Sequence, residues 1–131
     1  MSAYANNRFN DYVGIKFLEV SENGCTAILE NREQLQNSMD GVIHGGVLFT
    51  LADAVMGFAA APHVDGVQQS VSVECKINYL RPARGPVLKA VSSVVRRGKR
   101  IIVMEAKVME ENGELVAVAL GTYAKVGNHS S

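Results

Sequence analysis

The chain has 131 residues, of which 47% are hydrophobic and 20% charged. This length and composition are typical of one globular domain with its own core and exclude a disordered chain. Its 13 basic and 13 acidic residues give a formal net charge of zero, which speaks against bulk electrostatic binding of nucleic acid and favours self-association. Cys25 and Cys75 fit no metal-ligand spacing and are expected as small hydrophobic side chains in a reducing compartment.

Neither the N-terminal residues nor the apolar stretches have the pattern of a targeting or membrane segment. The N-terminal residues are polar and contain no apolar signal core. The longest apolar stretch, residues 42–61, contains His44, Thr50 and Asp53, and a membrane span should be longer and more uniformly apolar. We therefore expect a soluble cytoplasmic protein that contacts no membrane.

The first half of the chain predicts a hairpin and one long helix. Residues 1–13 are expected to be a mobile or short helical lead-in. The apolar runs 17–20 and 25–29 flank Asn23-Gly24, a pair that is typical of a hairpin turn. Residues 31–36 are polar, and residues 37–41 predict a loop. Residues 47–61 predict a helix of about four turns, opened by Gly45-Gly46 and closed by Pro62. Its apolar residues cover every side, which is typical of a buried helix.

The second half predicts four strands and a polar tail at residues 127–131. Apolar and polar residues alternate over 71–79, as in a half-buried strand. Further strands are expected at 87–97, 101–110 and 115–126, with turns at Gly98 and at Asn112-Gly113. The whole chain then forms a single α+β domain, an antiparallel sheet curled around one long buried central helix. One face of one sheet cannot cover such a helix on all sides, so we expect an oligomer.

Asp53 is the only acidic residue between Gly41 and Pro62. A lone carboxylate in an apolar helix is usually paired, protonated or functional, since its burial is unfavourable. The alternative is that this side of the helix reaches water or an interface.

The segment Gly41-Val42-Ile43-His44-Gly45-Gly46 comes directly before the helix. A helix start offers unpaired backbone N–H groups and a partial positive charge, and glycines let a ligand come close, so this segment suits an oxyanion hole. The alternative is that the glycines form a tight turn and that His44 is a hydrogen-bonded loop residue.

Two further groups have both a functional and a structural interpretation. Ser72 and Glu74 are expected on the polar face of the strand 71–79, where most side chains only meet solvent. Residues 96–100 place four positive charges around a turn, either as a local anion site or as a charged edge hairpin. The sequence contains no phosphate-binding glycine loop after a strand, no zinc-ligand spacing and no Gly-x-Ser-x-Gly motif.

Three segments together resemble a known family. Residues 44–53, His-Gly-Gly-Val-Leu-Phe-Thr-Leu-Ala-Asp, closely resemble the signature of hotdog-fold acyl-CoA thioesterases of the phenylacetate-degradation (PaaI-like) type. Residues 76–83 look like the strand after the helix in that family, and 112–117 with 121–123 resemble its last hairpin. The resemblance spans residues 14–126. It implies the hotdog fold, dimers that pair edge to edge, tetramers as dimers of dimers, and active sites built from both chains.

The resemblance also implies roles for individual residues. Asp53 would be the catalytic carboxylate, as general base on water or as nucleophile. The Gly45 N–H would polarise the thioester carbonyl. His44 would order the loop, and Ser72 would position the water. Candidate substrate-binding residues are Asn37, Gly46 and Tyr79, with Lys99 and Arg100 for the phosphates of coenzyme A. Relatives often have an asparagine six residues before the histidine; Asn37 precedes His44 by seven, which predicts a different pocket rim.

The sequence thus predicts a thioester hydrolase that cleaves an aryl- or medium-chain acyl-CoA to the free acid and coenzyme A. No metal and no cofactor are expected beyond the coenzyme A of the substrate, and the expected partner is a second copy of the chain. The main alternative is a non-catalytic acyl-CoA-binding or sensing protein on the same fold. A hydratase on this scaffold fits less well, because Asp40 and His44 lack the required spacing and context. A purely structural oligomer is the residual case.

Overall fold

The computed structural model describes residues 7–126, and the predicted tail at 127–131 lies outside them. The predicted order of two strands, one helix and four strands is confirmed, and residues 8–13 of the lead-in form a short helix. The elements are α1 (Arg8–Val13), β1 (Lys16–Ser21), β2 (Gly24–Glu30), the short 3₁₀ helix η2 (Glu33–Leu35), α2 (Gly45–Ala60), β3 (Ser70–Tyr79), β4 (Val87–Arg97), β5 (Ile101–Glu110) and β6 (Leu115–Lys125).

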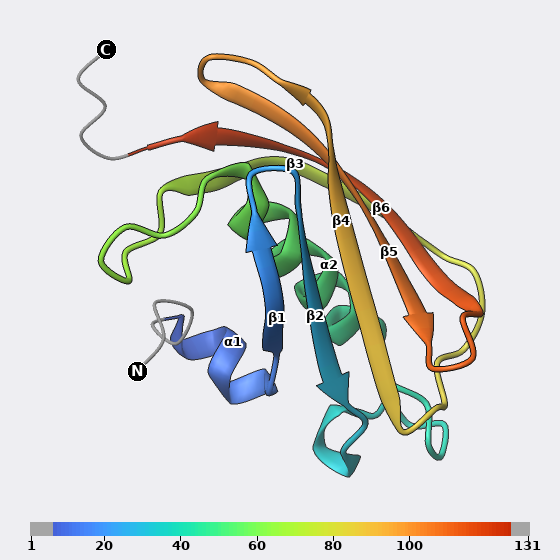
Figure 1. The fold of residues 1–131 in the computed structure, drawn as a ribbon. Coiled ribbons are helices and arrows are strands. Elements are labelled where there is room, and N and C mark those ends of the chain that lie inside the picture. The colour runs from blue at the N-terminus through green and yellow to red at the C-terminus, as the bar shows by residue number, and fades with distance from the viewer. Residues whose placement is uncertain (1–6, 127–131) are drawn as a thin grey trace.

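All six strands form one antiparallel sheet in the order β1-β2-β4-β5-β6-β3. The sheet curves around α2, which lies on its concave side (Figure 1). Strands β1 and β3 are the edges, and β3 reaches its place beside β6 after the chain has passed through α2. This is the hotdog architecture that the sequence predicted.

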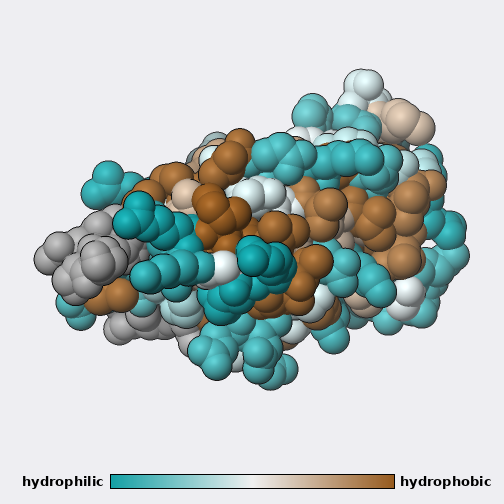
Figure 2. Space-filling view, turned by 90° about the horizontal axis from the view of Figure 1, so that it is seen from above, coloured by the Kyte–Doolittle hydropathy of each residue, from teal (hydrophilic) through white to brown (hydrophobic). Residues whose placement is uncertain are grey.

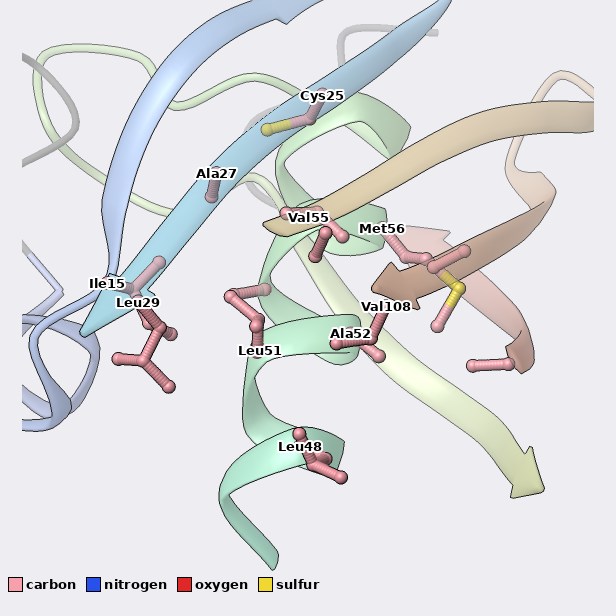
Figure 3. Packing of buried hydrophobic residues seen from close by; sticks show 14 of the residues in the cluster. Ile15, Cys25, Ala27, Leu29, Leu48, Leu51, Ala52, Val55, Met56 and Val108 are labelled. Carbon is pink, nitrogen blue, oxygen red and sulfur yellow. The ribbon is translucent and has the colours of Figure 1, made fainter. Parts of the chain in front are cut away.

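The core lies between α2 and the concave face of the sheet. Leu48, Leu51, Ala52 and Val55 of the helix are almost fully buried, and their spacing of three or four residues places them on one side of the helix. They pack with apolar side chains of the strands, such as Val108 (Figure 3). Removal of a fully buried leucine side chain from such a core costs roughly 2–5 kcal/mol.

One stripe of α2 is less covered than the sequence pattern suggested. Gly46 is exposed, and Thr50, Asp53 and Gly57 are half-buried. These four residues follow one another at intervals of three or four, so they share one side of the helix. The expectation of a helix buried on every side is therefore wrong for this stripe, which is small and polar in contrast to the rest.

Strand β3 carries a bulge that changes which side chains face α2. Ser72 pairs with Tyr123 and Glu74 with Thr122, so Val73 is an extra residue between them. The two-residue alternation shifts by one at such a bulge. Val71 and Val73 are 47% and 60% exposed. The prediction that Ser72 shares a solvent face with Glu74 is wrong, because the bulge separates them.

The surface of the molecule mixes apolar and polar residues. Seen from above in Figure 2, exposed apolar residues (brown) lie among hydrophilic ones (teal). Exposed large apolar side chains of the described residues include Leu18, Val95 and Leu120 of the sheet and Leu80 after β3. No helix within residues 7–126 has the length and apolar character needed to cross a bilayer.

Candidate active site

Asp53 lies in the middle of α2, on the stripe that the sheet leaves partly open. Its Oδ1 atom accepts two hydrogen bonds, from the Ser72 hydroxyl at 2.9 Å and from the Tyr123 hydroxyl at 2.7 Å. Asp53 is therefore half-buried and paired with two hydroxyl donors, on a side of the helix that the sheet leaves partly open. Its position is fixed by β3 on one side and by β6 on the other.

Each of the two donors has a structural reason to face Asp53. The bulge at Val73 turns Ser72 toward the helix. Tyr123 is almost fully buried on β6. Burial and the negative charge of Asp53 raise the pKa of the Tyr123 hydroxyl, so this group stays protonated and donates. Both hydroxyls therefore serve as hydrogen-bond donors to the Asp53 carboxylate.

The second carboxylate oxygen of Asp53 is available for chemistry. Both hydrogen bonds end on Oδ1, and no residue within 7–126 donates to Oδ2. Asp53 also lines a cavity that continues past Gly57 toward Phe58 and His63. An oriented carboxylate with one unoccupied oxygen next to a cavity can accept a proton from a water molecule or attack a carbonyl carbon.

The start of α2 is organised by His44. The helix begins at Gly45, two residues before the predicted start, and His44 is its N-cap. The His44 Nδ1 atom accepts a hydrogen bond from the Gly46 N–H at 2.8 Å and so satisfies one of the backbone donors that a helix start leaves unpaired. Gly46, predicted as a substrate-binding residue, has its N–H engaged in this cap.

The Gly45 N–H, in contrast, is unoccupied. Among residues 7–126 it donates no hydrogen bond. As the first N–H of a helix, it carries part of the positive end of the helix dipole. A carbonyl oxygen placed there would be polarised, as an oxyanion hole requires.

Tyr79 and Asn37 border this end of the helix. The Tyr79 hydroxyl donates to the Gly45 carbonyl at 2.9 Å, and a Cβ atom added to Gly45 would lie 3.3 Å from the Tyr79 ring. Asn37 lines a surface cavity together with Gly45 and Tyr79. Its side-chain oxygen accepts from the Met39 N–H at 2.6 Å and so shapes the loop before the helix.

The structure does not bring Gly45 and Asp53 together within one chain. Both residues lie on α2, eight positions apart. A rise of 1.5 Å per residue separates them by about 12 Å along the helix axis. An oxyanion donor and a catalytic carboxylate must both lie roughly 3 Å from the reacting group, so one chain cannot supply both to the same carbonyl.

The basic hairpin between β4 and β5 has two different roles. Arg97 donates to the carbonyl oxygens of Ala59 and Ala60, at 2.9 and 2.8 Å, and so satisfies the C-terminal end of α2. This part of the expected anion site is thus structural. Lys99 and Arg100 are exposed. They lie in the turn at the opposite end of the sheet from the start of α2 (Figure 1).

Tyr123 is the site residue that sequence reasoning missed as a chemical group. It was noted only as part of the last hairpin. Its hydrophobic neighbours suggest a core position, and only the pairing of β6 with β3 reveals that its hydroxyl reaches Asp53. Within residues 7–126, no three His, Cys, Asp or Glu side chains gather as a metal site would require.

A comparison with protein families identifies the chain's relatives. A family model described as the Thioesterase superfamily matches residues 40–117, which include α2, β3, β4 and β5. The chain belongs to the thioesterase superfamily. Together with the PaaI relative and the PaaI structure described next, this membership confirms the predicted hotdog-fold thioester hydrolase of the PaaI-like type.

Individual members of the superfamily cover nearly the whole chain. The acyl-coenzyme A thioesterase PaaI of Escherichia coli is 29% identical over 125 residues, 95% of this chain and 86% of that protein. The solved structure of E. coli PaaI aligns with a TM-score of 0.84 at 26% identity, covering 95% of this chain and 88% of that one. The medium/long-chain acyl-CoA thioesterase YigI of Salmonella typhimurium is 26% identical, covering 88% of this chain and 83% of that protein.

Proposed function

We propose that the protein hydrolyses an acyl-CoA thioester to the free acid and coenzyme A, with Asp53 as the catalytic carboxylate. The observation that carries the proposal is the Asp53 side chain, which Ser72 and Tyr123 hold at Oδ1 while Oδ2 is unoccupied. Two relatives are named acyl-CoA thioesterases, which supports coenzyme A as the thiol. The acyl group is aryl or medium-chain, and the reaction uses water and no cofactor.

The active site is formed by two copies of the chain. Strand β3 is an edge of the sheet, and its free backbone groups can pair with a second β3 about a two-fold axis. In that antiparallel pairing the Ser70 end of one β3 lies beside the Tyr79 end of the other. Gly45 is bonded to Tyr79 and Asp53 to Ser72. The pairing therefore brings Gly45 of one protomer toward the partner's Asp53.

The proposed chemistry follows from this arrangement. The Gly45 N–H binds the thioester oxygen and stabilises the charge that develops on it. Asp53 Oδ2 removes a proton from water while the water oxygen bonds to the carbonyl carbon, and the carbon–sulfur bond then breaks to release the thiolate. As a nucleophile, Asp53 would instead displace the thiolate and form an anhydride with the acyl group; water then opens this anhydride at the Asp53 carboxyl carbon, so the water oxygen stays on Asp53 in the first turnover. A single turnover in ¹⁸O-water separates the routes: only the first places the label directly in the released acid.

The same two-fold pairing suggests how the remaining predicted residues would contact the substrate. It brings the partner's Lys99 and Arg100 to the end of the sheet where Gly45 lies, so they can bind the phosphates of coenzyme A. Tyr79 and Asn37 border the cavity beside Gly45 and would contact the substrate there. We further propose that two such dimers form a tetramer through exposed apolar side chains of the sheet, such as Leu120.

The experiment follows thiol release from a panel of aryl and fatty acyl-CoAs with a colorimetric thiol reagent. Wild type is compared with Asp53→Asn and with the control Asp65→Asn, the same chemical change at an exposed position. Loss of a positioned general base costs roughly 10²–10⁴-fold, so we expect kcat of Asp53→Asn to fall by at least a hundredfold and that of Asp65→Asn to stay unchanged.

The outcomes separate the enzyme from the alternative. If Asp53→Asn hydrolyses every thioester as fast as wild type, the assignment of Asp53 is wrong. If the wild type binds acyl-CoA but releases no thiol from any ester, the protein is an acyl-CoA sensor rather than an enzyme.

A further inference from the structure

Two side-chain amides, those of Asn31 and Gln36, form a closed set of hydrogen bonds around Gly41. The Asn31 Nδ2 group donates to the Gly41 carbonyl at 3.1 Å, and the Gly41 N–H donates to Gln36 Oε1 at 3.2 Å. Gln36 Nε2 donates to Asn31 Oδ1 at 2.8 Å and closes the set. Gly41 has φ +79°, in the left-handed region where glycine is favoured. This amide network therefore holds the turn in the loop before α2 by both polar groups of the Gly41 backbone.

The Asn31 amide also reaches the loop before β4. Its Nδ2 group donates to the carbonyl oxygens of Gly85 at 3.1 Å and Arg84 at 3.4 Å. Asn31 follows directly after β2, and its backbone N–H donates to the Pro86 carbonyl at 2.9 Å. The end of β2, the loop before α2 and the loop before β4 lie together at one end of the sheet (Figure 1). One side chain thus joins three segments that are separate in the sequence.

The backbone just before Gly45 is bonded to residues on both sides of this network. The Ile43 N–H donates to the Ala83 carbonyl at 3.0 Å, and the His44 N–H donates to the Leu35 carbonyl at 2.8 Å. Ala83 belongs to the loop before β4, and Leu35 ends η2. These two hydrogen bonds hold the two residues that precede the first N–H of α2. The position of the Gly45 N–H therefore depends on the loops that the amide network holds.

The same two loops line the cavity beside Gly45. The loop before α2 contributes Met39 and Val42, and the loop before β4 contributes Pro82 and Ala83. Active sites need their groups held to within about 0.5 Å by supporting contacts, and an error of about 1 Å can cost roughly a hundredfold in rate. A network that holds both loops can therefore control the rate without touching the substrate.

We propose that Asn31 and Gln36 are positioning residues for thioester hydrolysis, whose amide network places the Gly45 N–H against the thioester carbonyl. This inference rests on the proposed function and adds two residues to it. The N–H donors of Asn31 are the essential part, because they bind carbonyl oxygens of both loops. Loss of these donors lowers kcat through the Gly45 N–H.

The first test removes the donors of Asn31 and keeps the shape of its side chain. Asn31→Asp retains the acceptor for Gln36 but turns a carboxylate oxygen toward carbonyl oxygens, which is unfavourable. We expect kcat for thiol release to fall about tenfold in Asn31→Ala and further in Asn31→Asp, with little change in KM. Gln34→Ala, at an exposed position nearby, is the control. Wild-type kcat in Asn31→Asp, or a rise in KM alone, overturns the proposal.

A variant of Gln36 opens the network from the other side. Gln36→Glu keeps an acceptor for the Gly41 N–H and loses the donor to Asn31, with no change in size. It is expected to lower kcat about tenfold as well. Urea denaturation checks that each variant is folded, and Gln36→Glu decides the matter if the Asn31 variants do not fold. An unchanged kcat in folded Gln36→Glu counts against the network.

A double-mutant cycle tests whether the network acts through Gly45. Gly45→Pro has no N–H to position, so adding Asn31→Ala to it should change kcat by less than about twofold. In the Gly45→Ala background, which keeps the N–H, Asn31→Ala should still lower kcat about tenfold. Equal losses in the two backgrounds would show that Asn31 acts elsewhere, and the proposal would be wrong.

A measurement without substrate separates this outcome from that of the proposed function. In ¹H–¹⁵N NMR spectra, Asn31→Asp should shift the Gly45 amide signal and speed hydrogen exchange at Ile43 about tenfold or more. The amide of Val55 in the middle of α2 should stay unchanged, and Gln34→Ala should affect none of these signals. If Gly45 and Ile43 do not respond, the network does not hold this backbone, whatever the activity. If they respond but no thioester is hydrolysed, the positioning of the N–H is supported and the proposed function alone fails.

Discussion

Gly45 and Asp53 lie on the same helix about 12 Å apart along its axis, and each is bonded to a different end of the same edge strand. The Tyr79 hydroxyl binds the Gly45 carbonyl, and the Ser72 hydroxyl binds the Asp53 carboxylate. Because of this separation, each protomer contributes Gly45 to one active site of the proposed dimer and Asp53 to the other. Most of the predictions below follow from it.

The first prediction concerns the Gly45 N–H. Proline is well tolerated at the first position of a helix, and His44 already has the extended backbone that a following proline requires, with φ −61° and ψ 137°. Gly45→Pro therefore removes the N–H with little effect on the helix. Gly45→Ala adds the same Cβ atom and keeps the N–H. We expect kcat of Gly45→Pro to fall about a hundredfold relative to Gly45→Ala. Equal rates for the two variants would exclude an oxyanion role for this group.

Hybrid dimers test whether the two halves come from different chains. Gly45→Pro and Asp53→Asn are each inactive alone in our proposal. A mixed dimer contains one site with both defects and one site with neither. Random exchange of equal amounts should restore about a quarter of the wild-type activity, since half the dimers are mixed and each has one intact site of two. Refolding the mixture and measuring thiol release checks this. A mixture that stays inactive after confirmed exchange would place both residues in one chain's site.

Tyr123 is expected to act as a positioning residue. Tyr123→Phe removes the hydroxyl that binds Asp53 Oδ1 at 2.7 Å and leaves the ring in the core. We expect kcat to fall roughly tenfold with little change in KM, since one hydrogen bond to a charged group is worth about 1.5–3 kcal/mol. Tyr12→Phe, at a highly exposed position, is the matched control. A change in KM alone would point to substrate binding instead.

The basic hairpin should separate into a structural and a binding part. Arg97→Leu removes the hydrogen bonds to the end of α2 and is expected to lower the free energy of unfolding by about 2 kcal/mol, measured by urea denaturation. The double variant Lys99→Ala/Arg100→Ala should instead raise KM for acyl-CoA about tenfold. Thioesters of N-acetylcysteamine lack the phosphates and serve as the control. If KM for both thiol groups rises equally, these residues do not bind phosphate.

The thiol of Cys75 reports on the charge of Asp53. Burial, and then the negative charges of Asp53 and Glu74, raise the pKa of Cys75 to about 11. Since only the thiolate reacts, alkylation by iodoacetamide should be slow at pH 8 and should accelerate about tenfold per pH unit up to that pKa. Asp53→Asn removes one negative charge, lowers this pKa and speeds the reaction at pH 8. Mass spectrometry of the Cys75 peptide measures the rate. An unchanged rate would mean that Asp53 does not act on this thiol.

The sequence pattern predicted the order of the elements because hairpin signals such as Asn23-Gly24 and the long apolar run of α2 are local. It also made Asp53 and Gly45 candidate site residues, because an acid in an apolar helix and glycines at a helix start can be recognised from the sequence alone. The distance between them follows from helix geometry and could have been derived from their residue numbers. The hydrogen bond between Tyr123 and Asp53 could not have been derived in this way, because it depends on the pairing of β6 with β3, two strands that are far apart in the sequence.

The position of His44 shows a second limit of sequence reasoning. A histidine before two glycines suggests a catalytic or loop residue. The structure agrees with the second interpretation and adds that its ring is the cap of α2, a role usually taken by smaller side chains. The bulge at Val73 was equally hidden, since an extra residue leaves the apolar alternation of the sequence unbroken while it changes the pairing.

The bulge at Val73 has a consequence for how β3 tolerates change. Before it, even-numbered residues such as Ser72 face the helix; after it, odd-numbered ones such as Tyr79 do. Ser72 and Tyr79 lie seven positions apart, an odd number that a regular strand would place on opposite faces. Deleting Val73 would make this spacing even, so a regular ladder would keep both side chains toward the helix. The bulge thus absorbs one surplus residue, and β3 should tolerate the loss of that residue with both half-sites intact.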